Sequence, residues 1–167
     1  AKDQNSFKLI ISLILFTIVI AMTIAFNSYW THGLADQSEI ILDNKDFANI
    51  QNSIGGIGAI TSEFFIRIFG ISAYFLTSLI CFFLIKFTFK IDKINLLQIS
   101  AIHVFLIIWT CLTCSLLTNK IFAGKLGIIM SNVTIPLIGH TGTIIILILT
   151  FLLVVVFFMN ESAPPDF

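Results

Sequence analysis

The sequence has little charge, and most of its charged residues lie outside its long apolar runs. Only 11% of the 167 residues are Asp, Glu, Lys or Arg, whereas 57% are hydrophobic, and the mean hydropathy is +1.04. A water-soluble domain of this size could not cover so much apolar side chain with polar surface. The formal net charge is zero, so no overall basic field attracts nucleic acid. The composition therefore excludes an ordinary soluble domain and argues against DNA binding by this chain alone.

Short catalytic motifs are also missing. The sequence contains no G-x-x-x-x-G-K-[ST] phosphate-binding loop, no H-E-x-x-H zinc motif and no G-x-S-x-G nucleophile elbow. No pair of carboxylates falls inside an apolar run, where it could relay a proton or hold a cation. We therefore expect no catalytic residue, no cofactor and no metal site, and we predict that this chain is not an enzyme.

Cysteine is scarce, and its placement does not favour metal or redox chemistry. Cys81, Cys111 and Cys114 all fall inside apolar runs, and the last two form a C-x-x-C. A zinc site needs a second pair of ligands, and a redox motif needs a thioredoxin-like βαβ context. Neither is present in the sequence, so we interpret these cysteines as small residues that pack within membrane helices.

Long apolar runs are what the sequence has instead. A helix needs about 20 apolar residues, each rising about 1.5 Å, to cross a hydrocarbon core of roughly 30 Å. The first run is flanked by Lys2 and Lys8, as a signal peptide would be, but it is too long and no good cleavage site follows. We predict an all-α membrane protein, folded as one compact bundle, with a retained first helix. The predicted spans are residues 7–28, 71–89, 96–117 and 141–159.

Two of the apolar stretches are too long for one span. Residues 54–89 and 124–159 would each make a helix of about 54 Å if unbroken. Residues before Gly70 alternate apolar and small or polar faces at helical spacing. We therefore predict a short interfacial or re-entrant helix before each span, at residues 55–69 and 124–138. The expected breaks are Gly70 in the first stretch and the region of Pro136, Gly139 and Gly142 in the second.

Charge placement predicts the orientation in the membrane. Short loops rich in lysine stay in the cytoplasm, whereas residues 31–53 form a mainly acidic segment that we predict to be an outer loop. Tyr29 and Trp30 just before it suit an interfacial anchor. Residues 161–167, with two prolines, resemble the start of a cytoplasmic linker. The predicted cytoplasmic lysines are Lys2, Lys8, Lys86, Lys90 and Lys93, and the outer Lys120 and Lys125 run against this pattern.

A glycine pattern repeats along the chain. The four positions of the first copy return 69 residues later, and in each copy an apolar span follows. Each unit would begin and end in the cytoplasm, so the two units would be parallel and related by an axis along the membrane normal. We therefore predict two parallel two-helix repeats, each with a short interfacial helix before its second span. The matched pairs are Gly55 and Gly124, Gly58 and Gly127, Ser62 and Ser131, and Gly70 and Gly139.

A few polar residues in or near the apolar runs are candidates for chemistry. Glu63 and Arg67 are spaced to pair on one helix face, either as a surface pair or, in a spanning helix, as part of an ion path. His103 lies inside the third span, where it is either a neutral residue bonded between helices or a proton relay. His32 and His140 fall near the outer surface and are expected to be solvated.

Several stretches resemble a known family. Four segments resemble the sequence of the N-terminal membrane domain of FtsK/SpoIIIE-type DNA translocases. They are residues 52–59 and 69–74 and the corresponding residues 124–131 and 136–139. Residues 29–38 resemble the first outer loop of that domain, especially in Bacteroidetes-like versions. The resemblance implies four spans with cytoplasmic ends in a bacterial inner membrane. It also implies that a cytoplasmic hexameric ATPase, absent from this chain, pumps DNA through the division septum.

The resemblance leads to one functional hypothesis and one alternative. The chain would be a membrane anchor that forms homo-oligomers and contacts lipid and other cell-division membrane proteins, reaching DNA only through the missing motor. The alternative is a small transporter or channel, or an accessory subunit of a larger membrane complex.

Lys125 departs from the glycine pattern of the family, since the matched position of the first copy is Gly56. The expected structural or interaction residues are Gly55, Gly56, Gly58, Ser62, Glu63, Arg67, Gly70, Tyr74, His103, Gly124, Gly127, Ser131, Pro136 and Gly139.

Overall fold

The computed structural model describes residues 2–41, 47–89, 91, 95–117 and 120–162, and in this part of the chain it contains helices and no strand. Four helical segments are long and apolar enough to cross a membrane. The prediction of an all-α protein with four spans is therefore confirmed. The helices are α1 (Lys2–Ile41), α2 (Gly55–Phe69), α3 (Tyr74–Phe89), α4 (Leu96–Leu117) and α5 (Lys120–Ser162), with 3-10 turns at Phe47–Asn49 and Gly70–Ala73.

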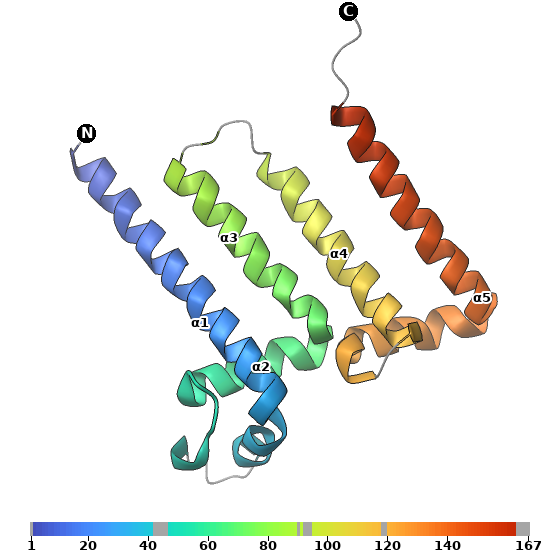
Figure 1. Ribbon diagram of the computed structural model, residues 1–167, viewed down its shortest axis with the longest axis horizontal. Helices are drawn as coiled ribbons and strands as arrows, with labels where there is room; N and C mark the ends of the chain where they lie inside the picture. The colour runs from blue at the N-terminus through green and yellow to red at the C-terminus, as the bar shows by residue number, and fades with distance from the viewer. Residues whose placement is uncertain (1, 42–46, 90, 92–94, 118–119, 163–167) are drawn as a thin grey trace, which may run out of the picture.

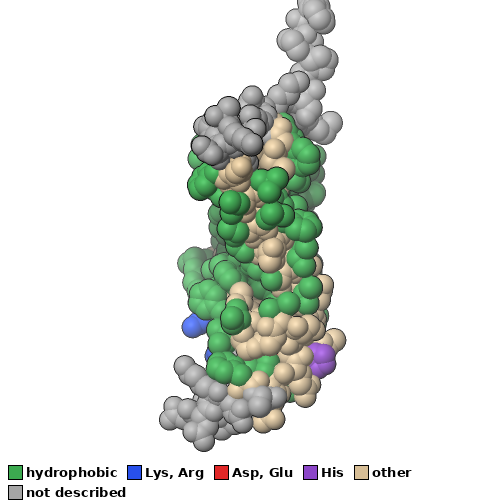
Figure 2. Space-filling view, turned by 90° about the vertical axis from the view of Figure 1, so that its left-hand side faces the viewer, with side chains coloured by type: hydrophobic (Ala, Val, Ile, Leu, Met, Phe, Trp, Pro, Cys, Tyr) green, Lys and Arg blue, Asp and Glu red, His purple; other side chains and the backbone are tan. Residues whose placement is uncertain are grey.

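The long helices form a single row rather than a closed bundle. Figure 1 shows α1, α3, α4 and the last part of α5 side by side, and each contacts its neighbour in that order. Seen edge-on, the molecule is narrow (Figure 2). The expectation of one compact bundle is wrong, and the reason is the solvent. Lipid is as apolar as the helix surfaces, so nothing forces these faces to be buried against one another.

Helix α1 is longer than the sequence predicted. It continues to Ile41, whereas we placed an outer loop from residue 31. Polar side chains end an apolar run without ending a helix, and here their hydroxyls find partners within the helix itself. Thr31 Oγ1 donates to the Ser28 carbonyl and Ser38 Oγ to that of Ala35. The loop is thus confined to the stretch between α1 and α2, of which residues 42–46 lie outside the described part.

Glycines with positive φ mark the bends of the chain. They are Gly55 (φ 68°), Gly70 (φ 61°), Gly124 (φ 64°) and Gly139 (φ 75°), and we call them the hinge glycines. L-residues with a side chain rarely adopt these angles, so a glycine is required at each bend. Pro136 stays within the helix, and the break in α5 falls at Gly139. Helix α2 and residues 125–138 of α5 are therefore short helices, each bounded by two hinge glycines.

The two short helices lie across one end of the row, which we call the hinge end (Figure 1). The start of α1, the end of α3, the start of α4 and the end of α5 lie at the opposite end, which we call the terminal end. Most residues between α3 and α4, with Lys90 and Lys93, are outside the described part. We call α1, α2 and α3 the first unit and α4 and α5 the second unit. Helix α5 continues through Ser162, and the remainder of the predicted linker lies outside the described part.

The buried core sits at the hinge end. Phe26 of α1, Ile66 of α2 and Ala73 are fully buried and pack together, with Tyr29 and Trp30 against them. The ring of Phe26 meets that of Tyr74 edge-on at 5.6 Å. The aromatic pair that we predicted to face the membrane interface thus also packs within the protein, and it ties α1 to the start of α3.

Candidate interaction site at the glycine hinges

The two units meet where two hinge glycines touch. A Cβ on Gly70 would overlap the carbonyl of Phe122, and one on Gly124 would overlap the backbone of Gly70 and Ile68. Both glycines are buried. The absence of side chains therefore allows the bend that ends α2 to pack, backbone against backbone, on the bend that begins the second short helix.

Polar and aromatic groups surround this contact. The thiol of Cys111 on α4 donates to the carbonyl of Phe69 at 3.2 Å, and its sulfur lies 3.0 Å from Ser72 Oγ. The rings of Trp30 and Phe122 lie 5.3 Å apart. Cys111 thus has a packing and hydrogen-bonding role, and the contact joins α1, α2 and α4 to the start of α5.

The other repeated positions hold each short helix against a long one. Gly127 packs on the backbone of Cys111, and Ser115 Oγ of α4 donates to Ser131 Oγ at 2.7 Å. In the first unit, a Cβ on Gly58 would overlap the side chain of Asn52. Ser62 and Ser131 each donate to the carbonyl three residues earlier, at 3.1 and 3.0 Å. Gly56 lies under Phe47, whereas Lys125 at the matched position is exposed.

The sequence did not single out Asn52, which is the centre of the polar contacts in the first unit. Its amide nitrogen donates to the Ala25 carbonyl at 3.2 Å and to Ser62 Oγ at 3.4 Å, and its oxygen accepts from the Ile54 N–H at 3.0 Å. The buried carboxylate of Asp36 accepts from the Gln51 N–H at 2.7 Å. An Asn three residues before a helix-starting glycine was the available signal, because amides commonly bond the backbone of such turns.

Glu63 and Arg67 do pair, but not as a surface pair. The Glu63 carboxylate is 3.5 Å from the Arg67 guanidinium, and it accepts a hydrogen bond of 2.8 Å from Gln37 of α1. The Glu63 side chain is only 11% exposed, against 63% for Arg67. The interpretation as a surface pair is therefore wrong for Glu63, because the extended α1 covers it. Its bond to Gln37 fixes α2 against the polar end of α1.

The two remaining hinge glycines are open. Within the described part of the chain, a Cβ on Gly55 or Gly139 would meet no atom within 4 Å, apart from its chain neighbours and the nearby backbone of its own helix. Pro136 and His140 near the second are exposed. The described residues also contain no group of three or more His, Cys, Asp or Glu that could hold a metal ion. The site is thus built for packing of backbones and small side chains.

A comparison with known protein families shows which family the chain belongs to. The family model described as the 4TM region of DNA translocase FtsK/SpoIIIE matches residues 4–164. The chain belongs to this family. No significant match was found among curated proteins or among solved structures. The resemblance seen in the sequence is thereby confirmed over nearly the whole chain. In FtsK/SpoIIIE proteins the 4TM region is the membrane part and not the ATPase motor.

His103 joins the two central helices of this 4TM region. Its Nδ1 lies 2.8 Å from the carbonyl of Ile99, which can only accept, so Nδ1 carries the proton. Nε2 then accepts from Ser78 Oγ of α3 at 3.2 Å. The rings of Phe75 and Phe82 meet the imidazole edge-on. Both ring nitrogens of His103 therefore have partners, one within α4 and one on α3.

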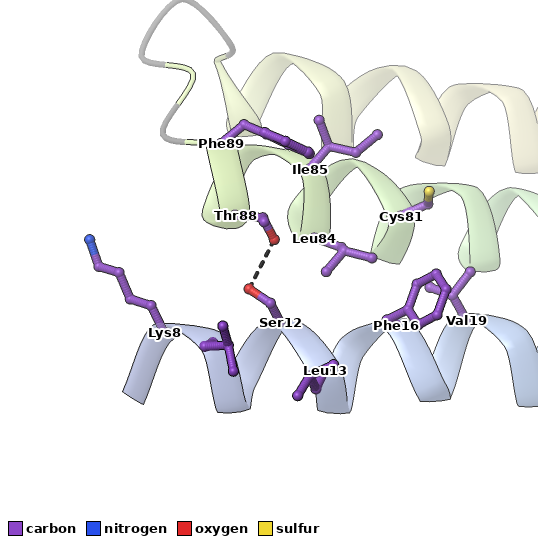
Figure 3. Close-up of a pocket in the computed structure, with 11 residues that line it drawn as sticks. Lys8, Ser12, Leu13, Phe16, Val19, Cys81, Leu84, Ile85, Thr88 and Phe89 are labelled. Atoms are coloured by element: carbon purple, nitrogen blue, oxygen red, sulfur yellow. Dashed lines mark hydrogen bonds between the residues drawn. The ribbon is translucent and has the colours of Figure 1, made fainter. Parts of the chain in front are cut away.

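Two apolar grooves open toward the terminal end of the 4TM region. Figure 3 shows the first, between α1 and α3, where Thr88 Oγ1 donates to Ser12 Oγ at 2.9 Å. The second lies between α4 and α5. Three residues of α3 that line the first groove have counterparts 69 positions later that line the second. The pairs are Leu84 and Leu153, Ile85 and Val154, and Thr88 and Phe157.

Proposed function

We propose that this chain is the membrane anchor and oligomerisation module of a septal DNA translocase that acts in cell division and chromosome segregation. The observation that carries the proposal is the family match over residues 4–164. The arrangement of the chain supports it, because the start of α1 and the end of α5 lie at the same end of the row (Figure 1). A cytoplasmic motor attached after α5 would then sit on the same side as the N-terminus.

The proposed mechanism is mechanical. A motor that pulls on DNA pushes against its own attachment, so the anchor must resist displacement from the membrane. Four apolar helices side by side provide this resistance, since moving any of them would expose hydrocarbon-facing side chains to water. The crossing short helices and their buried backbone contacts keep the four spans in register at the hinge end.

We place this module in a bacterial inner membrane, with the termini in the cytoplasm and the hinge end outside. Lysine placement supports this orientation, since Lys8 lies near the start of α1 and Lys86 in the last turn of α3. The mainly acidic connection between α1 and α2 is then on the outer face, where it would meet other division proteins. Its residues 42–46 lie outside the described part, so this role rests on charge and family alone.

The alternative of a transporter or channel is less well supported. A transported solute needs a path enclosed by helices, with polar groups along it. Here the long helices lie in one row (Figure 1), and His103 already bonds Ser78 and Ile99 through its two nitrogens. An accessory subunit of a larger complex would have the same geometry as a translocase anchor. The gene sequence and the cellular position of the protein distinguish the subunit from the anchor.

Two observations test the proposal. The first is the coding sequence after Phe167, where an anchor predicts a Walker A motif within the same reading frame. The second is the position of a fluorescent fusion of this chain in dividing cells of its own host. The anchor predicts fluorescence at the septum, and His103→Gln should leave it there. Uniform fluorescence around the cell, together with a stop codon at this point of the gene, would contradict the proposal.

A further inference from the structure

The hinge glycines form one closed contact and leave two open ends. Gly70, which ends the first short helix, packs on Gly124, which begins the second. Gly139 ends the second short helix as Gly70 ends the first, but it is exposed. Gly55 begins the first short helix as Gly124 begins the second, and it too has an open surface. Each chain therefore has one unused end glycine and one unused start glycine, at opposite edges of the row (Figure 1).

We infer that Gly139 of one copy packs against Gly55 of the next copy and so repeats, between chains, the contact that joins Gly70 to Gly124 within a chain. The inference rests on the oligomerisation role in the proposed function and names the surface that performs it. The φ values support equivalent bends, since they are 68° at Gly55 and 64° at Gly124, and 61° at Gly70 and 75° at Gly139.

The residues beside the open glycines are apolar and exposed. Leu137 and Ile138 are 76% and 44% exposed, at the positions that Ile68 and Phe69 occupy against the second unit. Ile54 beside Gly55 is 36% exposed, whereas Ala123 at the matched position is fully buried. Both surfaces therefore combine a positive-φ glycine with apolar flanks, as the internal contact does, and in the single chain both lack the neighbour that the internal contact has.

Membrane geometry then determines the kind of assembly. All copies in one membrane share one orientation, so neighbouring copies are related by rotation about the membrane normal. A contact between two different surfaces, repeated by such a rotation, closes into a ring when the rotation divides a full turn and otherwise continues as an open row. Apolar side chains cover the outward edge of α1 over much of its length (Figure 2), which suits contact with the α5 edge of the preceding copy or with lipid.

The contact between copies would be weaker than the internal one. The ring of Phe122 that meets Trp30 has Ser53 as its counterpart, and Ser72 beside Cys111 has Thr141. The glycine packing and apolar flanks are kept, whereas this ring contact and the Ser72 hydroxyl are not. The assembly is therefore best tested in the membrane, without detergent.

Cysteine crosslinking of this 167-residue chain in bacterial membranes tests the inference. In a background of Cys81→Ala, Cys111→Ser and Cys114→Ala, the variant carries Ile54→Cys and Ile138→Cys together, and the probe is a short bis-maleimide. The two sites lie at opposite edges of the row, so a link between them joins different copies. We expect a ladder of multimers from the double variant and only monomer from either single variant.

A matched control uses exposed positions off the proposed contact. Ile60→Cys with Ile129→Cys places one cysteine on each short helix, as the test pair does, at similar exposure, 46% and 51%, and should give no ladder. Adding Leu137→Trp to the double variant should abolish its ladder, because the larger side chain blocks the close approach at Gly139. It should leave the stability of the single chain unchanged, since Leu137 is largely exposed.

The possible outcomes separate the inference from the proposed function. Dimers from a single variant would overturn the inference, because they show a contact between like surfaces, and so would equal ladders from the control pair. If septal fluorescence persists while the double variant gives no ladder, this contact is wrong and the anchor role stands. If the ladder forms and fluorescence is not septal, the contact stands and the anchor role falls.

Discussion

The two units of this membrane module reach the same bends by different means. In the first unit, side chains hold the short helix: Asn52 bonds Ala25 and Ser62, and Gln37 bonds Glu63. In the second unit, close approach of backbones does so, with Gly127 against Cys111. The hinge glycines are common to both units, whereas the supporting contacts differ. The bends therefore depend on the glycines, and the supports depend on the local connection.

The length of the connection explains the difference. Thirteen residues separate α1 from α2, whereas only residues 118 and 119 separate α4 from α5. A long connection brings backbone N–H groups that no helix ladder satisfies, so side chains become their partners. Asp36, Ser28 and Asn52 accept from the backbone N–H groups of Gln51, Ser53 and Ile54. The first unit thus needs polar side chains that the second unit does not.

The largest expected effect on stability comes from comparing a hinge glycine in the closed contact, Gly124, with an open one, Gly139. Gly124→Ala combines backbone strain with overlap on Gly70, so we expect it to lower the free energy of unfolding by more than about 4 kcal/mol. Gly139→Ala has the same strain and no overlap, so we expect a loss of about 1–3 kcal/mol. Unfolding in mixed detergent and SDS micelles measures both, and equal losses would contradict the packing described here.

An intermediate effect tests the polar support of the first unit. Asn52→Ala leaves the Ile54 N–H and the Ala25 carbonyl without this partner, so we expect a loss of about 1–3 kcal/mol in the same unfolding assay. The control is Ile121→Ala, at the matched position of the second unit and 58% exposed, which should change stability little. If the control is the more harmful change, the two units do not differ as proposed.

The smallest effect concerns the hydroxyl pair of the second unit. Ser115→Ala removes the donor to Ser131 at 2.7 Å, and hydrogen bonds between membrane helices contribute about 0.6 kcal/mol on average. We therefore expect a loss below about 1 kcal/mol, smaller than that of Asn52→Ala. A loss as large as that of Asn52→Ala would show that side chains support both units equally.

The sequence predicted the helical elements well where one residue decides the outcome. The bounds predicted for α4 are those observed, and Gly70 ends α2 because only glycine adopts its backbone angles with the next unit against it. The break in α5 was predicted less sharply, since Pro136 and Gly142 competed with Gly139. Proline fixes φ near the helical value, so Pro136 can remain in the helix. Gly139 has a φ of 75°, which interrupts the helix.

The arrangement of the helices was less predictable. Helices that are apolar all round carry no signal for which faces pair, so the single row was missed. Contacts such as Gln37 with Glu63 and Ser78 with His103 join residues 26 and 25 positions apart on different helices. Their partners depend on helix rotation and register, which the apolar pattern leaves undetermined. The end of α1 was missed because hydropathy marks where apolar residues stop and not where the helix does.

The central claim is that the spans carry the hinge end and the terminal end to opposite sides of a membrane. Single cysteines at Leu34, 86% exposed near the hinge end, and at Asn95, exposed before α4, test it in intact cells with a membrane-impermeant maleimide. The background lacks the three native cysteines. We predict labelling of Leu34→Cys in intact cells and of Asn95→Cys only after the cells are opened. Labelling of both variants in intact cells would contradict the membrane arrangement and the anchor role built on it.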